Sequence, residues 1–254
     1  MTPARRILVA PSLEDLANEA AALFARGAEE ACAARGAFSV ALAGGSTPER
    51  LYRLLSGEGD PLYRARIPWK RIDWFWGDER HVAPDHAESN YRMACEALLS
   101  KVPVRDGSVH RIRAENPDAG AAAEAYEAEI RAHFQPRPGA LPRFDLILLG
   151  MGSDGHTASL FPGTDVLRVS ERWVAAPHVP KLAARRITLT PLVINAAAQV
   201  IFLVAGAEKA ETLREVLEGP QEPDRLPSQL VRPEAGRLVW LLDRQAASRL
   251  EEST

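Results

Sequence analysis

The sequence has 254 residues, of which only two are cysteines, Cys32 and Cys95, and it lacks any long hydrophobic run. Two widely separated thiols are too few for a disulfide framework or a four-ligand zinc site, and they indicate a reducing compartment. The apolar run near the N-terminus ends at Pro11, which makes it too short for a signal-peptide core or a membrane span. We therefore expect a cytoplasmic protein without a membrane partner.

A large excess of one charge sign is also lacking. The chain carries 31 Lys and Arg against 34 Asp and Glu, a formal net charge of -3. Such a balance produces no long-range field that would gather nucleic acid, so nucleic acid is not expected as a partner. Hydrophobic residues make up 46% and charged residues 26%, which is typical of globular proteins. A single α/β domain over residues 1–254 is the expected organisation.

Short apolar runs predict a large sheet, because continuous β-prone runs are typical of parallel strands covered on both faces. The predicted strands are 38–43, 72–76, 144–149, 187–189, 200–205 and 238–242. Helical spacing of apolar residues predicts helices over 13–34, 48–55, 91–99, 119–134 and 209–217. The alternation of strands and helices indicates a doubly wound, mostly parallel central sheet with helices on both faces.

Polar clusters that directly follow strands are candidate sites, because ligands bind at the carboxyl ends of an open α/β sheet. The first cluster is Gly44, Gly45, Ser46 and Thr47. The glycines allow close backbone approach, Ser46 or Thr47 can cap the next helix, and N–H groups at a helix start attract anions. A capped turn without a ligand is the alternative. Neither the Walker A nor the GxGxxG spacing is present, so a small phosphorylated metabolite fits better than a nucleotide.

The second cluster, Asp78, Glu79 and Arg80, follows strand 72–76. It can place two carboxylates and a guanidinium around one substrate, although an exposed, salt-bridged turn has the same sequence signature. His81 and His86 lie nearby, but no recognisable ligand spacing supports a metal site with Asp78. No metal is therefore expected there.

The third cluster follows strand 144–149 and surrounds Asp154 and His156 with three glycines. A carboxylate beside a histidine favours the imidazolium that forms when the ring accepts a proton, which is suited to general-base catalysis. A structural histidine in a turn is the alternative. No GxSxG motif is present, and Ser159 is interpreted as part of a helix, so a serine nucleophile is disfavoured.

Two cations further along the chain could close around a phosphate held by the first cluster. Arg186 precedes the apolar run 187–189, and Lys209 follows strand 200–205 at the expected start of a helix. Cation–phosphate pairs form strong charge-assisted hydrogen bonds. Ordinary surface charges are the alternative for both residues.

Together these clusters make the sequence resemble the 6-phosphogluconolactonases, a branch of the superfamily that also contains glucosamine-6-phosphate deaminase. The resemblance rests on ALAGGSTPERLY, DWFWGDERHVAPDHAESNYRMA, FDLILLGMGSDGHTASLFPG, RITLTPLVINAA and VAGAEKAETL, in that order. It implies a Rossmann-like, glucosamine-6-phosphate deaminase-like fold. It also implies hydrolysis of 6-phospho-D-glucono-1,5-lactone to 6-phosphogluconate, the second step of the oxidative pentose phosphate pathway, without a cofactor.

The resemblance also implies roles for individual residues. His156 would activate water, Arg80 would bind substrate or stabilise negative charge, and Asp154 would support the site. The residues implied in holding the substrate and its phosphate are Gly44, Gly45, Ser46, Thr47, Asp78, Arg186 and Lys209. The partner would be a small phosphorylated sugar lactone, and the enzyme a monomer or small homo-oligomer.

Two other functions have to be weighed. The deaminase branch typically carries a DEY-type motif, so Arg80 favours the lactonase. Related folds also serve as sugar-phosphate sensors in transcription regulators, but those carry an added helix-turn-helix. Here the first strand is expected almost at the start of the chain, and a sensor has little need of His156 beside Asp154.

Overall fold

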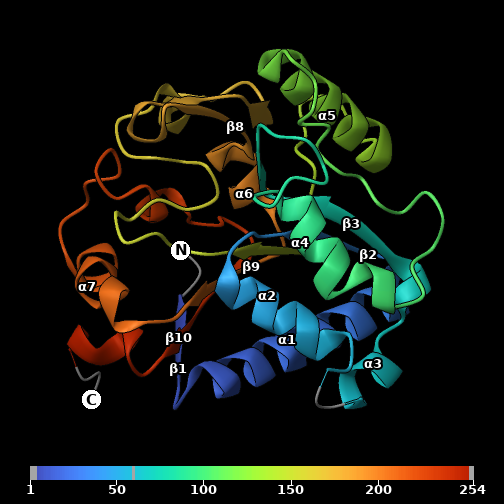
Figure 1. Cartoon of the computed structure of the whole chain (residues 1–254), viewed down its shortest axis with the longest axis horizontal. Helices are drawn as coiled ribbons and strands as arrows, with labels where there is room; N and C mark the ends of the chain where they lie inside the picture. Colours follow the sequence, from blue (N-terminus) through green and yellow to red (C-terminus); the bar gives the residue numbers. More distant parts are fainter. Residues whose placement is uncertain (1–4, 59–60, 252–254) are drawn as a thin grey trace.

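A computed structural model describes residues 5–58 and 61–251 and places a six-stranded parallel sheet at the centre of the molecule (Figure 1). Every neighbouring pair in this sheet is parallel. In spatial order the strands are β1 (Arg6–Ala10), β10 (Arg237–Asp243), β9 (Gln199–Val204), β5 (Leu146–Leu149), β2 (Phe38–Leu42) and β3 (Ile72–Trp76). The predicted parallel central sheet is confirmed.

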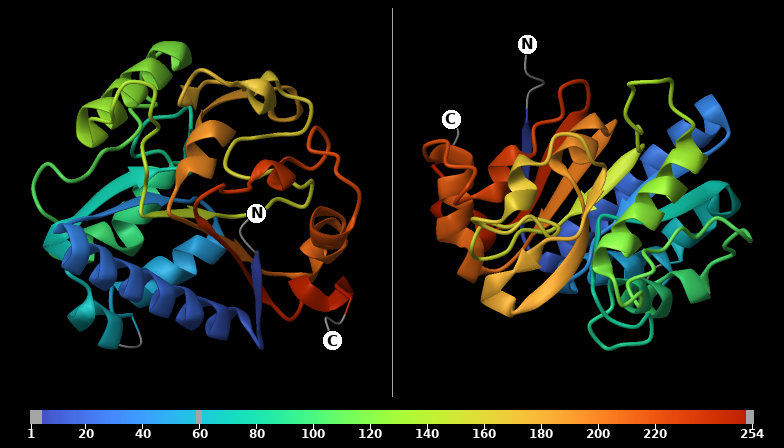
Figure 2. Two further views of the ribbon diagram at one scale, coloured as in Figure 1. Left: turned by 180° about the vertical axis from the view of Figure 1, so that it is seen from behind. Right: turned by 90° about the horizontal axis from the view of Figure 1, so that it is seen from above.

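Helices cover both faces of the sheet (Figure 2). The α-helices are α1 (Leu13–Arg35), α2 (Ser46–Leu55), α3 (Leu62–Arg66), α4 (Asn90–Ala97), α5 (Ala119–Phe134), α6 (Pro191–Ala196) and α7 (Ala210–Glu218). Short 3₁₀ turns are η1 (Trp69–Arg71), η2 (Leu99–Lys101), η3 (Asp165–Arg168), η4 (Pro180–Leu182), η5 (Ala207–Lys209), η6 (Pro227–Leu230) and η7 (Ala246–Arg249). Helix α1 begins where Ser12 accepts the N–H of Asp15, and it ends at Gly36 with φ 84°.

Burial explains why the strand sequences are continuously apolar. All residues of β2, β3, β5 and β9 are buried, because helices lie over both sides of these strands. Large rings fill the layers, and the rings of Phe202 and Trp240 stack with centroids 3.8 Å apart. Burial of each such side chain stabilises the fold by about 1.5–3 kcal/mol. The core therefore holds the carboxyl ends of the strands in fixed positions.

The prediction that run 187–189 belongs with the parallel central strands is wrong. It forms the end of β8 (Ala184–Leu189), which pairs antiparallel with β4 (Asp78–Arg80), β6 (Val174–Ala175) and β7 (His178–Val179) in separate ladders. An apolar run reports burial and not the direction of its partner strand, which explains the error. This antiparallel layer carries Asp78, Glu79 and Arg80.

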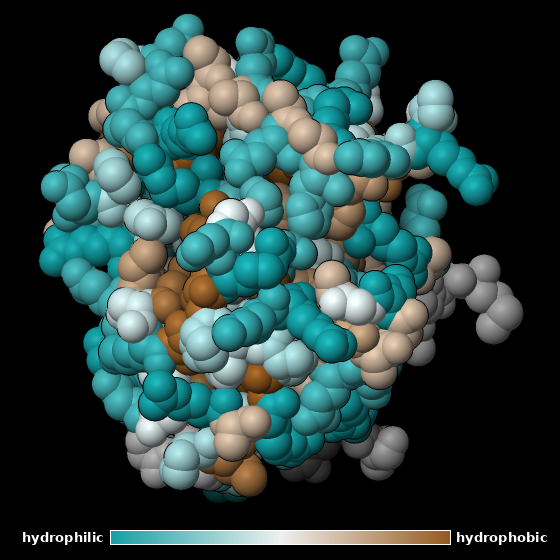
Figure 3. All heavy atoms as spheres, turned by 90° about the vertical axis from the view of Figure 1, so that its right-hand side faces the viewer, coloured by the Kyte–Doolittle hydropathy of each residue, from teal (hydrophilic) through white to brown (hydrophobic). Residues whose placement is uncertain are grey.

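The surface gives no sign of a membrane span in the described part of the chain, where no helix combines the required length and apolarity. The face shown in Figure 3 is mostly hydrophilic, with hydrophobic residues gathered near its middle. Much of the surface of any folded protein is apolar, so exposed apolar residues alone indicate no partner.

Candidate active site

One cavity at the carboxyl ends of the central strands brings the three polar clusters together. Loops after β2, β3, β5 and β9 line it, as expected for an open α/β sheet. The predicted site residues in its wall are Gly44, Gly45, Ser46, Thr47, Asp78, Arg80, His156 and Lys209. Asp154 and Arg186 lie outside the lining, each directly behind or beside a residue that belongs to it.

The loop after β5 presents His156 through tight backbone turns. Gly152 donates to the carbonyl of His156 at 2.9 Å, and Gly155 has a left-handed φ of 78°. A Cβ on Gly152 would lie 2.1 Å from Nδ1 of His156, so only glycine allows the ring to lie against the loop. The imidazole also stacks on Phe161 at 4.1 Å. These contacts restrain the ring in one orientation.

Asp154 is the partner of the imidazole. Its Oδ1 lies 2.5 Å from Nδ1 of His156, and its Oδ2 accepts from Nζ of Lys181 at 2.9 Å. The hydrogen bond with His156, followed by that with Lys181, holds the pKa of Asp154 well below its usual range against the opposing effect of burial. A carboxylate only accepts, so Nδ1 carries a proton, and in the neutral imidazole Nε2 has the lone pair. This arrangement suits a ring that accepts a proton through Nε2.

The first cluster forms the N-terminus of α2, but not with the expected cap. Helix α2 begins at Ser46, its N-cap is Gly45 with φ 100°, and no side-chain hydrogen bond caps it. The prediction that Ser46 or Thr47 caps the helix is therefore wrong. Both residues lie inside the first turn, where their own N–H groups are among those a cap would satisfy. The uncapped N–H groups remain available for an anion.

Asn90 is a cavity residue that the sequence analysis did not identify. It opens α4 directly after the second cluster, and its Nδ2 donates to the carbonyl of Asp78 at 2.9 Å. A Cβ on Gly44 would lie only 1.9 Å from Oδ1 of Asn90. Gly44 is thus glycine because Asn90 occupies the space beside it. The helix-opening pair Ser89-Asn90 was the available sequence signal.

The carboxylates of the second cluster do not form the salt-bridged turn considered above. Glu79 is buried and accepts the N–H groups of Arg80, Asn90 and Tyr91 and the hydroxyl of Ser89. Burial raises the pKa of Glu79, although the three backbone N–H donors oppose the shift. Neither Asp78 nor Glu79 has an ion-pair partner within the described residues. Glu79 therefore joins β4 to the start of α4 and does not line the cavity.

Asp78 is held from the third cluster. Its Oδ2 accepts from Oγ of Ser159 at 2.7 Å. Ser159 lies in a turn between Thr157 and Leu160, so its interpretation as a helical residue is wrong. This hydrogen bond joins β4 to the loop that follows β5. Within the described residues, His81 and His86 form no metal-ligating group with Asp78.

Two cations, Arg80 and Lys209, line the remaining space, and Arg186 lies beside Arg80. Arg80 lines the cavity and uses one donor on the carbonyl of Glu88, while Arg186 is its register partner on β8. Burial and the nearby Arg80 lower the pKa of Arg186. Burial also lowers the pKa of Lys209, and Glu208 and Asp243 oppose that shift. A bound anion would relieve the repulsion between the two guanidinium groups.

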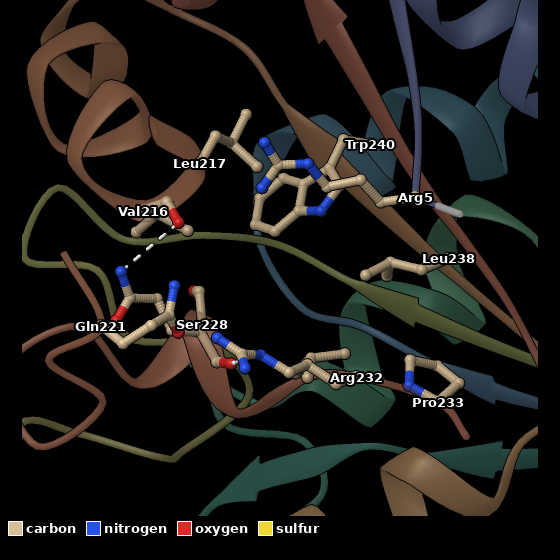
Figure 4. Close-up of a pocket in the computed structure, with 11 residues that line it drawn as sticks. Arg5, Val216, Leu217, Gln221, Ser228, Arg232, Pro233, Leu238 and Trp240 are labelled. Atoms are coloured by element: carbon tan, nitrogen blue, oxygen red, sulfur yellow. Dashed lines mark hydrogen bonds between the residues drawn. The ribbon is translucent and has the colours of Figure 1, made fainter. Parts of the chain in front are cut away.

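A second cavity, between α7, η6 and β10, contains none of the predicted site residues (Figure 4). Its lining includes Arg5, Arg232 and Trp240. It adjoins the loop that carries His156 through η6, where Ser228 donates its N–H and its hydroxyl to the carbonyl of Gly155 at 2.9 and 2.8 Å. This cavity therefore lies behind the loop that presents His156.

Comparison with known proteins identifies the family. The model of a family of glucosamine-6-phosphate isomerases and 6-phosphogluconolactonase matches residues 11–240. A 6-phosphogluconolactonase of Synechocystis sp. is 42% identical over 221 residues, which cover 87% of this chain and 88% of that protein. The solved structure of 6-phosphogluconolactonase from Trypanosoma cruzi is 33% identical with a TM-score of 0.84, and the match covers 98% of each chain.

A monomeric glucosamine-6-phosphate deaminase shares the fold at only 21% identity, with a TM-score of 0.80 and coverage of 96% of this chain and 99% of the deaminase. The predicted fold class is confirmed, as is the resemblance on which it was based. The chain belongs to the family of glucosamine-6-phosphate isomerases and 6-phosphogluconolactonases.

Proposed function

We propose that this protein hydrolyses 6-phospho-D-glucono-1,5-lactone to 6-phospho-D-gluconate, the second step of the oxidative pentose phosphate pathway, with His156 as general base. The observation that carries the proposal is the single cavity that joins His156, oriented by Asp154, to the N-terminus of α2 and to Arg80. A base, an anion site and a guanidinium within one small cavity match a phosphorylated lactone. The relatives named above carry the lactonase name over nearly the whole chain.

The phosphate of the substrate would bind at the start of α2. The N–H groups of Ser46 and Thr47 are available there, and the helix dipole favours an anion at this end. Lys209 reaches the same cavity from η5 and would form an ion pair with the phosphate. Arg186 lies beside Arg80, outside the lining, and would add positive charge there without contacting the cavity. This end of the cavity would select for the phosphorylated substrate.

Hydrolysis would proceed through water activated by His156. Nε2 takes one proton from water while the water oxygen attacks the lactone carbonyl, and Asp154, kept ionised by its lowered pKa, stabilises the imidazolium. Arg80 has five N–H donors and uses one on Glu88, so others can stabilise the oxyanion. The ester C–O bond then breaks, and the ring oxygen leaves as a hydroxyl after it takes the proton from the imidazolium. The new carboxylic acid ionises in water.

We further propose that residues 1–254 form one domain, which acts in the cytoplasm without a cofactor. One continuous hydrophobic core cluster of the described residues supports a single domain. The free thiols of Cys32 and Cys95 are compatible with a reducing compartment.

The test is the consumption of freshly generated lactone by purified protein, with chelator present, against the spontaneous rate. We expect strong acceleration for the phosphorylated lactone and little for gluconolactone. His156→Ala should lower kcat by about 10²- to 10⁴-fold. The control His178→Gln alters an exposed histidine of β7 and should retain full turnover. Absence of acceleration would refute the lactonase, and glucosamine 6-phosphate would then be tested. Normal turnover in folded His156→Ala would refute the general base alone.

A further inference from the structure

A cluster of metal-ligating side chains lies away from the cavity just described. Asp73, near the start of β3, His110, in the segment after η2, and His133, in the last turn of α5, each offer one ligand atom, and these atoms lie within 4.8 Å of one another. The active-site residues follow the opposite, carboxyl end of β3. The cluster is therefore a separate feature of the fold.

Regular structure fixes these three side chains in place. Asp73 and Phe75 point to the same face of β3, because side chains alternate along a strand. The N–H of His110 donates to the carbonyl of Trp74 at 2.8 Å, which holds the histidine beside the strand. Both imidazoles contact the ring of Phe75, with centroids 4.4 Å away for His110 and 5.1 Å for His133. Phe75 thus forms an apolar floor under both rings.

His110 has the tautomer and the partner typical of a metal-bound histidine. Its Nδ1 lies 2.8 Å from Oε1 of Glu129, and since a carboxylate only accepts, Nδ1 carries the proton. In the neutral ring Nε2 then has the lone pair, and this buried atom has no hydrogen-bond partner among the described residues. Histidine ligands usually donate their second nitrogen to a carboxylate, which orients the ring and raises its basicity.

The ligand atoms of Asp73 and His133 lie almost as close together as two ligands of one bound cation. Nε2 of His133 lies 3.9 Å from Oδ2 of Asp73. Two ligands of a tetrahedral zinc ion, each about 2.0–2.1 Å from the metal, lie roughly 3.3 Å apart. The carboxyl end of α5 also favours positive charge at this position.

We propose that Asp73, His110 and His133 bind one zinc-class divalent cation, with water as the fourth ligand. Two imidazoles and a carboxylate suit zinc and its neighbours in the first transition row better than magnesium or calcium, which prefer oxygen ligands. The ion would join β3, the segment around His110 and the end of α5. It has a structural role and takes no part in the chemistry of the cavity.

Arg105 supplies a sharp test, because it competes for the same carboxylate. Its Nη2 lies 2.6 Å from Oδ1 of Asp73, and its side chain is 50% exposed, so it can turn into solvent. A bound cation would repel this guanidinium. Removal of the arginine charge should therefore strengthen metal binding, whereas a purely structural ion pair would predict no gain.

The experiment is calorimetric titration of zinc into chelator-treated full-length protein, with thermal unfolding in parallel. We expect one zinc per chain, with the melting temperature raised by about 5–10 °C at a hundred-fold excess over Kd. His133→Gln should weaken this binding by at least about 10-fold. Arg105→Gln should strengthen it, and His178→Gln, which alters an exposed histidine elsewhere, should not change it.

Three outcomes would overturn the proposal. The first is the absence of zinc binding by the wild-type protein. The second is equal affinity in wild type and His133→Gln, which would assign the bound zinc to another place. The third is unchanged or weaker affinity in Arg105→Gln, which would show that Asp73 is not a ligand. His133 is exposed enough, at 25%, for its variant to fold, and the unfolding curves without zinc verify this.

Discussion

Alanine at position 44 would place a Cβ 1.9 Å from Oδ1 and 2.5 Å from Cγ of Asn90, distances that no packed structure tolerates. Asn90 is only 2% exposed and would have to move, which breaks the 2.9 Å hydrogen bond from its Nδ2 to the carbonyl of Asp78. A buried group left without its partner costs about 1–3 kcal/mol. Gly44→Ala should therefore lower the melting temperature by about 2–12 °C, at roughly 2–4 °C per kcal/mol for a chain of this size.

The assay is thermal unfolding of four proteins together with wild type. Gly150→Ala is the matched control, because Gly150 lines the same cavity but a Cβ there would meet nothing within 4 Å. Asn90→Ala should be destabilised through loss of the same hydrogen bond. The double variant Gly44→Ala/Asn90→Ala should be as stable as Asn90→Ala alone, since the obstacle to the new Cβ is gone. Wild-type stability in Gly44→Ala, or additive losses in the double variant, would refute the reasoning.

Three further predictions concern the charged groups of the cavity. Asp154→Asn removes the negative charge that stabilises the imidazolium, and its amide NH₂ can donate to Nδ1 and favour the wrong tautomer of His156. We therefore expect kcat to fall by about 10²- to 10⁴-fold with little change in KM, and loss of affinity alone would contradict this role. Because the folded pKa of Asp154 is depressed, its contribution to stability is present above its unfolded pKa of about 3.9 and is lost as pH falls through the folded value. Acid titration of unfolding should therefore show wild type and Asp154→Asn converging only below pH of about 4, and a constant difference would disprove the shift. Burial lowers the pKa of Lys209, so its charge should be lost at a lower pH than that of an exposed lysine, and KM for the phosphorylated lactone should rise with alkaline pH in wild type but not in Lys209→Ala.

The positions of most strands along the chain could be predicted because a local pattern of apolar residues indicates burial. All residues of 38–42 and 199–204 are buried, because helices cover both faces of these strands. Burial on both faces requires consecutive apolar residues, and a sequence shows such a run directly. The same reasoning failed for Ile187 and Leu189, which are equally buried but pair antiparallel with β4 and β6. Burial is a local requirement, whereas strand direction depends on partners that are distant in the chain.

The residues of the candidate site show the same division. His156 and Asp154 could be predicted together because they are two positions apart within a glycine-rich loop that follows a strand. The capping error at Ser46 arose because cap and first helical turn differ by one residue, and only the backbone conformation of Gly45 decides between them. Asn90 was not predicted as a cavity residue because its side chain packs against Gly44. This contact joins residues that are distant in the chain, so the sequence does not show it.

By itself, the sequence determined the α/β class, the loops that line the candidate site and the family. Each of these is recognisable from short stretches of consecutive residues. Tertiary structure alone decided that Glu79 supports α4 instead of lining the cavity, and that Ser159 holds Asp78. It alone placed Asp73 beside His110 and His133, which come from three separate segments and show no ligand spacing in the sequence. Contacts between distant segments are set by how helices and strands pack, and packing is a property of the whole chain.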